Sequence, residues 1–360
     1  MAGEFTWTKF GSCNLEDPFF DSFKKEYAEF SIWFKKKTDA GEEALVARDD
    51  QGILAFVYLK AETEPIKLQD RELPAVSRLK IGTFKMADRF QGQRVGEGAM
   101  GVALWRWQEL RLEEVYATIF DEHGPLMALF ERFGFRNVGL NARGECVYLR
   151  SRKHIDYSDP YTSFPFINPD IKKAGIIPIE AEYHDRLFQF SELKGTEREI
   201  EQEAAGNGMT KVYIATPYKQ LSYKTGEPVF IYRKTEHQGN GQSYYRSCVT
   251  SFTTVTKVHV IKENGKAAVS CDDFVREAGN KTIFAEDVLR TAYLTKANIV
   301  LLEMVYNGVF GKGHNVTFGE LHGVGLFEEY PYGIEYSKEE FIKILEMGGR
   351  DAKNIIVDQT

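Results

Sequence analysis

The sequence predicts a two-domain protein of the α+β class. At 360 residues the chain is more than twice as long as a common domain of about 150 residues. The first 150 residues alternate strand-like with helix-like segments, strand-like segments predominate from Met209 onward, and four X-Pro steps interrupt the stretch between them. We therefore expect a first domain over residues 1–150, a packed connector over 151–208 and a second domain over 209–360.

In the first domain, we expect a helix over residues 22–34. Four aromatic side chains recur there at spacings of four, three and four: Phe23, Tyr27, Phe30 and Phe34. Residues 43–49 and 53–59 are strand-like and flank a turn, which predicts a hairpin. Further strands are expected at 78–86, 114–120 and 145–150, and further helices at 95–110 and 126–133. The order α-β-β-β-α-β-α-β predicts a mixed sheet with helices packed on it.

The second domain is richer in strands. β-Branched and aromatic residues predict four of them, at 211–215, 228–233, 244–252 and 298–304. Short helices are expected at 272–276 and 285–289. A final helix at 336–345 begins with a capping box, because Ser337 is followed three residues later by Glu340.

Composition and charge exclude several classes of protein. A hydrophobic content of 43% predicts packed cores, and a net charge of −7 argues against a general polyanion binder. The chain start lacks the basic and apolar runs of a signal peptide, and no apolar run of about 18 residues predicts a membrane span. Four scattered cysteines form no C-x-x-C pair, so we expect neither a disulfide framework nor a metal site, and a cytoplasmic location.

A glycine-rich turn lies between the strand ending at Met86 and the helix starting at Val95. At a helix start, several backbone N–H groups lack partners and point the same way, and the helix dipole adds positive potential. Such a turn can bind a diphosphate. Residues 86–99, which include the turn and the first residues of the helix, hold three glycines: Gly92, Gly96 and Gly98.

In its order of strands and helices, its glycine turn and the segment Ala128-Leu129-Phe130-Glu131-Arg132-Phe133-Gly134-Phe135, the chain resembles the GNAT acyltransferase superfamily over residues 15–150. The resemblance implies acetyl-CoA as cosubstrate and N-acetyl transfer as reaction. The loop implied to hold the coenzyme A diphosphate, Q/R-x-x-G-x-G/A, matches Gln91, Gly92, Gln93, Arg94, Val95 and Gly96. Arg94 stands where the first glycine usually is, and its side chain is a candidate for an added charged contact. A second register starts at Gln93, but we prefer the first, because Gln91-Gly92 then takes the place of the usual Arg-Gly. The resemblance further implies that Phe84 and Met86 lie along the pantetheine arm.

The catalytic groups depart from those that the resemblance implies. The superfamily commonly has an Asn after the fifth strand and a Tyr in the next helix, and those places hold His123 and Phe130 here. Phenylalanine cannot donate a proton, so the acid is His123, Tyr116 or water, or no acid is needed. Asp121 and Glu122 are candidates for the base, as are Glu62 and Glu64. We take His123 and Glu122 as the leading pair.

From Met209 to about Gly325 the chain resembles the ASCH/PUA-like β-barrel group. The residues that carry this are Gly226-Glu227-Pro228-Val229-Phe230-Ile231-Tyr232-Arg233, Tyr245-Arg246-Ser247-Cys248-Val249-Thr250-Ser251-Phe252 and Phe274. The Lys and Glu of that group's Gly-x-Lys-x-x-Glu-x-Arg signature are not at their spacing, so amidohydrolase activity is not expected. RNA binding is the remaining implication. Residues 209–325 hold 14 Lys and Arg against 10 Asp and Glu, a local charge of +4. The RNA-binding candidates are Lys219, Tyr232, Arg233 and Arg246.

Three hypotheses follow. The leading one is an acetyl-CoA-dependent N-acetyltransferase whose second domain presents RNA, with tRNA as one version. The second is an acetyltransferase acting on proteins or small amines. The third is a regulator that binds acetyl-CoA and nucleic acid without catalysis, which Phe130 in the acid position favours.

Overall fold

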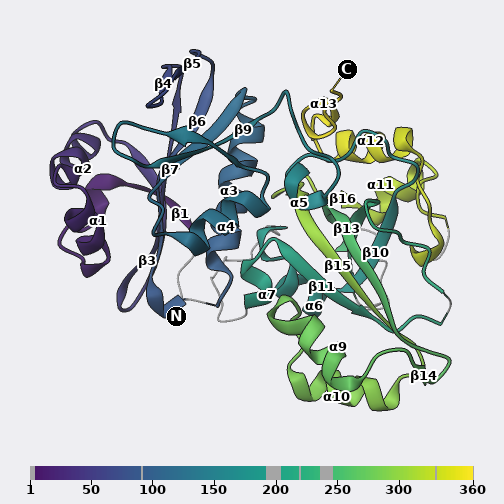
Figure 1. Cartoon of the computed structure of the whole chain (residues 1–360). Coiled ribbons are helices and arrows are strands. Elements are labelled where there is room, and N and C mark those ends of the chain that lie inside the picture. The colour runs from purple at the N-terminus through teal and green to yellow at the C-terminus, as the bar shows by residue number, and fades with distance from the viewer. Residues whose placement is uncertain are drawn as a thin grey trace. The chain divides into compact units, whose positions relative to one another are not determined.

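The structure is a computed structural model that describes residues 5–90, 92–191, 204–218, 220–235, 246–328 and 331–359 (Figure 1). The described residues fall into two compact units. The first unit contains residues 5–154 and 204–207, and the second contains 155–191 and 208–359. The described part of the expected connector is thus divided, and residues 155–191 belong to the second unit.

The mixed sheet that the sequence predicts for the first domain is confirmed. Seven strands lie in the order β1-β2-β3-β6-β7-β9-β8. Their bounds are Thr6–Lys9 (β1), Glu43–Asp49 (β2), Gly52–Glu62 (β3), Arg78–Met86 (β6), Glu114–Ile119 (β7), Arg136–Leu140 (β8) and Cys146–Ser151 (β9). All neighbours are antiparallel except the parallel pair β6–β7. The sequence analysis missed β1, β8 and a small hairpin of β4 (Ile66–Lys67) with β5 (Glu72–Leu73).

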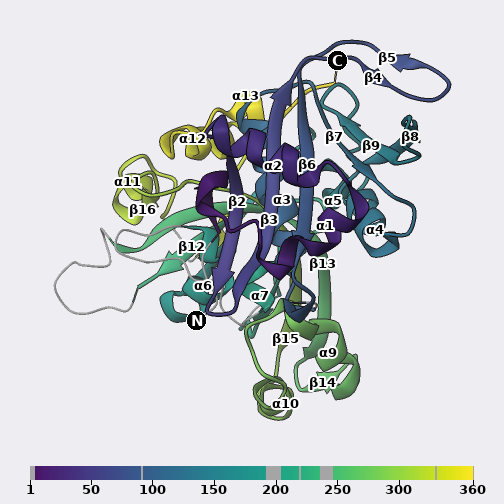
Figure 2. The same cartoon turned by 90° about the vertical axis from the view of Figure 1, so that its left-hand side faces the viewer.

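Helices cover both faces of this sheet (Figure 2). The short α1 (Asp21–Glu26) and α2 (Phe30–Asp39) lie on one face, and α3 (Val95–Glu109) and α4 (Gly124–Arg132) lie on the other. The single helix expected at 22–34 is wrong, because the chain is extended at Tyr27, with φ −125° and ψ 100°. Phe23 and Phe30 still lie on the same side despite the break, because their rings stack with 5.2 Å between the centroids.

The parallel pair β6–β7 separates halfway along its length. Cα partners run from Arg78 opposite Glu114 to Ile81 opposite Ala117. From Thr83 to Met86, β6 pairs with β3, whereas Thr118 and Ile119 of β7 pair with β9. The sheet is therefore split between the C-terminal ends of β6 and β7.

The second unit is built on one curled sheet of five strands in the order β10-β12-β13-β15-β11. Their bounds are Gly175–Glu180 (β10), Thr210–Ala215 (β11), Pro228–Lys234 (β12), Cys248–Glu263 (β13) and Ile299–Val309 (β15). Tyr213 on one edge strand lies 3.4 Å, hydroxyl to carbonyl oxygen, from Pro178 on the other. The described strands thus form a half-barrel, and an ASCH/PUA-like barrel stays a prediction.

Two short strands and several helices complete the second unit. β14 (Lys266–Ala267) and β16 (Val316–Thr317) pair with β13, whose described part begins later than the strand expected at 244–252. Residues 244 and 245 lie outside the described residues. The helices are α5 (Pro160–Ser163), α6 (Ala181–Leu187), α9 (Cys271–Ala278), α10 (Glu286–Thr295), α11 (Phe318–Gly323), α12 (Lys338–Met347) and α13 (Ala352–Ile355).

The final helix confirms its predicted cap. Ser337 and Glu340 form the capping box at the start of α12. The helix buries its apolar face in the core of the second unit, where Phe341 stacks on Phe230 with 4.6 Å between ring centroids. Among the described residues, no helix is both long enough and apolar enough to cross a membrane.

Candidate functional site

A sharp turn brings the start of α3 to the end of β6. After the 3₁₀ turn η3 (Asp88–Phe90), the chain takes the left-handed conformation at Gly92, with φ +80°, and again at Arg94, with φ 58° and ψ 14°. Between them, the amide of Gln93 donates to the carbonyl of Phe90 at 3.2 Å. Gln91, the first residue of the matched loop, lies outside the described residues.

The first amides of α3 have no acceptor within the helix itself. The N–H groups of Val95 and Gly96 lie in the first turn, where helix geometry provides no intrahelical acceptor. Arg94, the N-cap residue, makes no side-chain hydrogen bond to the helix backbone. A Cβ built on Gly96 would lie 3.7 Å from Met86 Cγ and 3.9 Å from Leu129 Cδ2, so this turn faces the end of β6 and α4. The positive end of α3 is thus located beside the split in the sheet.

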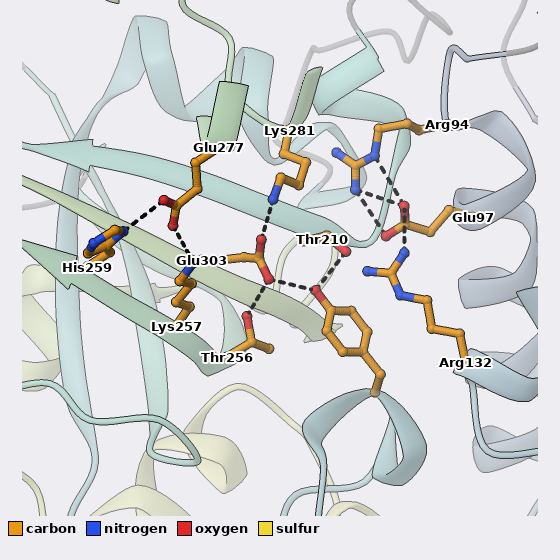
Figure 3. Close-up of polar contacts among 11 residues, drawn as sticks. Arg94, Glu97, Arg132, Thr210, Thr256, Lys257, His259, Glu277, Lys281 and Glu303 are labelled. Carbon is orange, nitrogen blue, oxygen red and sulfur yellow. Dashed lines mark hydrogen bonds and ion pairs between the residues drawn. The ribbon is translucent and has the colours of Figure 1, made fainter. Parts of the chain in front are cut away.

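The Arg94 side chain is directed along α3 (Figure 3). Its Nη2 lies 3.0 Å and 2.9 Å from the two carboxylate oxygens of Glu97, and its Nε lies 3.1 Å from Oε2. Arg132 on α4 approaches the same carboxylate at 3.9 Å. The side chains of Arg94 and Glu97 are each 9% exposed. In this structure the Arg94 guanidinium is paired with Glu97, and its contact with a diphosphate stays a prediction.

Phe84 and Met86 lie on the side of β6 that faces α3 and α4. Both are half-buried. The Phe84 ring packs edge-on against Phe130 at 5.9 Å, and Met86 is the neighbour of Gly96. The intervening Lys85 points to the opposite side, where its Nζ donates to the Phe19 carbonyl at 2.6 Å. This alternation places Phe84 and Met86 on the same face of β6, and their contact with a pantetheine arm stays a prediction.

His123 follows the end of β7 and forms the N-cap of α4. Its side chain is 40% exposed, and its Nε2 lies 3.9 Å from Oε2 of Glu26 at the end of α1. Glu122, the second leading candidate, is exposed. The structure thus brings His123, but not Glu122, into contact with an element on the other side of the sheet.

Tyr116, the other acid candidate, is buried and is paired with the base candidate Glu62. The hydroxyl of Tyr116 donates to Glu62, and burial, followed by this hydrogen bond, raises the pKa of Tyr116. Burial would raise the pKa of Glu62, but hydrogen bonds from Lys60 and Tyr116 hold it below its usual value. Tyr116 pairs with Lys80, where β6 and β7 are still joined, so the couple lies away from the split. Phe130 is fully buried and contacts the rings of Phe84, Phe135 and Tyr148.

Sequence reasoning missed a tyrosine–carboxylate pair close to the end of β7. Tyr27, at the break between α1 and α2, donates from its hydroxyl to Glu145 Oε1 at 2.9 Å. Asn141 donates to the other oxygen of the same carboxylate at 2.6 Å. The Tyr27 ring packs on Phe120, just beyond β7, at 5.8 Å. Burial, followed by the hydrogen bond to Glu145, raises the pKa of Tyr27, so the phenol keeps its proton at neutral pH.

The described RNA-binding candidates differ in exposure. Tyr232 is buried, with its ring 4.9 Å from that of Phe327, so it has no open face for a base to stack on. Arg233 is committed to Asp185 by two contacts of 2.8 Å. Arg246 is exposed, and Lys219 lies outside the described residues. Of the four candidates, the structure thus shows one at the surface.

A polar cluster in the second unit centres on Glu303 (Figure 3). Its carboxylate accepts hydrogen bonds from Tyr161 at 3.2 Å, from Thr256 at 3.0 Å and from Lys281. Burial would raise the pKa of Glu303, but the bond from Lys281 holds it below its usual value. Because Tyr161 also reaches Thr210 at 2.9 Å, the cluster joins α5 and the 3₁₀ turn η5 (Gly279–Lys281) to the sheet. Within the described ranges, no group of three or more His, Cys, Asp and Glu side chains could hold a metal ion.

Comparisons with known proteins concern the first part of the chain. The sequence matches no protein-family model and no curated protein. Among solved structures, Ard1 from Thermoplasma volcanium is similar at 14% identity and a TM-score of 0.31, over 42% of this chain and 96% of that one. The structure of a bacterial toxin is similar at 13% identity and a TM-score of 0.33, over 43% of this chain and 92% of that one. Arabidopsis thaliana Naa50, in complex with a bisubstrate analogue, is similar at 16% identity and a TM-score of 0.26, over 33% of this chain and 80% of that one.

Proposed function

We propose that the first unit is an acetyl-CoA-dependent N-acetyltransferase. The observation that carries this is the split between β6 and β7, with the first turn of α3 located beside it. A split in a sheet offers unpaired strand backbone, to which the amides of an extended pantetheine arm can bind as a strand would. The first-turn amides of Val95 and Gly96 suit a diphosphate. The residues present therefore fit acetyl-CoA, with Phe84 and Met86 lining its arm.

Acetyl transfer needs a neutral amine, a group that accepts its proton and a donor for the departing thiolate. Acetyl-CoA supplies the activated acyl group. His123 is the candidate acceptor, because it lies at the N-cap of α4, a short segment after the end of β7, and histidine is the most common general base. Tyr27 is the candidate donor, because its ring packs against Phe120 at the same strand end. This assignment supplies the acid that Phe130 cannot provide.

Calorimetry with acetyl-CoA tests the proposal. Gly96→Ala should bind nearly as well as the wild type, because its Cβ would meet only ordinary contacts with Met86 and Leu129. Gly96→Phe should lose binding, because the ring would occupy the space between these side chains. Gly323→Phe is a matched control, since Gly323 lies in the second unit with no atom near its Cβ position. Absence of heat with the wild-type protein would refute the proposal.

We propose further that the second unit binds RNA, with tRNA as the acceptor. Its support is the local charge of +4 over residues 209–325 and the exposed Arg246. Thiol release from acetyl-CoA with cellular RNA, but not with lysine peptides or small amines, would support this acceptor. Release with peptides or amines alone would identify a protein or small-amine acetyltransferase. Binding of acetyl-CoA with no thiol release from any acceptor would favour a regulator.

A further inference from the structure

Arg94 has a backbone conformation that an arginine rarely adopts. Its φ of 58° and ψ of 14° lie in the left-handed region, where a Cβ is close to the following carbonyl. Glycine takes this conformation readily, because it has no Cβ. This conformation gives a reason for the glycine at this position of the Q/R-x-x-G-x-G/A pattern. An arginine here needs an interaction that stabilises the left-handed conformation.

The ion pair with Glu97 can provide this stabilisation. Glu97 lies one turn further along α3, and both of its oxygens contact the Arg94 guanidinium at 2.9–3.1 Å. Both side chains are 9% exposed, so water screens the pair less than it would at the surface. A two-pronged contact of this kind fixes orientation as well as distance. The backbone at residue 94 in turn sets the direction of the Val95 and Gly96 N–H groups.

We infer that Glu97 is a positioning residue, which holds Arg94 in the left-handed conformation and so orients the amides that bind the diphosphate. This inference rests on the proposed function of the first unit. It differs from the sequence hypothesis for Arg94, in which the guanidinium itself contacts the diphosphate. In the structure the same guanidinium is engaged by a carboxylate of its own helix.

Two substitutions at one position separate these roles. Arg94→Gly removes the side chain but favours the left-handed backbone, whereas Arg94→Ala removes the side chain and disfavours that backbone. If the left-handed backbone at residue 94 is what binding requires, the Kd for acetyl-CoA should stay within about twofold of wild type in Arg94→Gly. It should rise about fivefold to tenfold in Arg94→Ala. The KM for acetyl-CoA should rise in the same proportion, with kcat unchanged. Equal losses in both variants would assign the role to the guanidinium and overturn the inference, as would no loss in either.

A double-mutant cycle tests Glu97 itself. Removing a carboxylate from the first turn of a helix should by charge alone strengthen anion binding. We expect the opposite for Glu97→Ala in the wild-type background, a Kd raised about fivefold, because Arg94 is released. In the Arg94→Gly background, Glu97→Ala should not weaken binding, because there is no arginine to hold. Equal weakening in both backgrounds would refute the positioning role.

The positioning role of Glu97 can still be tested if the wild-type protein does not bind acetyl-CoA. That result would remove the proposed function, and thermal unfolding of the same variants would then test the ion pair. Arg94→Ala should unfold at a lower temperature than Arg94→Gly if the left-handed conformation is required. Equal unfolding temperatures would overturn the inference independently of any ligand.

Discussion

The hydroxyl of Tyr27 donates a hydrogen bond to the carboxylate of Glu145, which lies 118 positions further along the chain. Glu145 is only 4% exposed. The bond joins the break between α1 and α2 to the segment leading into β9. The residue that makes this bond is also the one at which the chain leaves the helical path.

Replacing this tyrosine tests its proposed role as the acid. Tyr27→Phe keeps the ring on Phe120 but removes the proton that would pass to the thiolate. We expect kcat for thiol release to fall about 100-fold with the Kd for acetyl-CoA unchanged. The free energy of unfolding should fall by about 1–3 kcal/mol, because the buried Glu145 loses a donor.

Tyr148→Phe is the matched control for Tyr27→Phe. Tyr148 is also buried, and its hydroxyl donates to Glu131 at 3.0 Å. Burial, followed by that bond, raises the pKa of Tyr148 to about 12. Its loss should destabilise the protein while kcat is retained. A similar fall of kcat in both variants would show that Tyr27 acts through stability alone.

A tyrosine at position 130 should not supply an acid. Phe130 is fully buried, and its ring contacts Phe84, Phe135 and Tyr148. Phe130→Tyr would place a hydroxyl in this aromatic environment, at a cost of about 1–3 kcal/mol in the free energy of unfolding. We expect no gain in thiol release, measured beside thermal unfolding. A gain would mean that position 130 can reach the thiolate and that Tyr27 is not required.

The local features of the first unit could be predicted from the sequence, because short-range chemistry determines them. The glycines before α3, the start of that helix at Val95 and the strand ending at Met86 are all properties of neighbouring residues. The Tyr27–Glu145 pair could not be predicted in this way, since only the folded chain brings its members together. The pattern indicated a helical face at Tyr27 and gave no signal at Glu145.

The second unit shows two other limits of the sequence. β10 contains Pro178, which indicated a break, yet β10 is an edge strand, where a proline need not disrupt the sheet. The segment containing Tyr232 and Arg233 was correctly predicted as a strand. Alternation along a strand does not say what covers each face, and here Phe327 covers Tyr232 while Asp185 binds Arg233.

A buried histidine should make the second unit sensitive to acid. His184 is fully buried, with Nδ1 2.8 Å from Asp185 and Nε2 2.8 Å from the Thr250 hydroxyl. Burial lowers the pKa of His184 below 6.5, and Asp185 offsets this only in part. The unfolded chain therefore takes up the proton first as the pH falls, so stability present above about pH 6.5 is lost below it.

Thermal unfolding between pH 7 and 5 measures this effect. The unfolding temperature of the wild type should fall over that range, and His184→Asn should fall less. Burial would raise the pKa of Asp185, but hydrogen bonds from Arg233 and His184 bring it to about 2, so its own contribution is lost below this window. His154→Asn, at an exposed histidine, is the control and should follow the wild type. Parallel curves for all three proteins would contradict the prediction.

Two arginines of the second unit should respond differently to removal. Arg246 is exposed, and if it contacts RNA phosphate, Arg246→Ala should weaken binding and reduce the slope of log K against log salt by about 1. The unfolding temperature of the Arg246→Ala variant should equal that of the wild type. Arg233→Ala should leave the slope unchanged and destabilise the unit by at most about 3 kcal/mol, because Asp185 loses its bidentate partner but is partly solvated. Titration of a fluorescent tRNA at several salt concentrations, with unfolding measured in parallel, separates the two effects. An unchanged salt slope in Arg246→Ala would place RNA binding elsewhere.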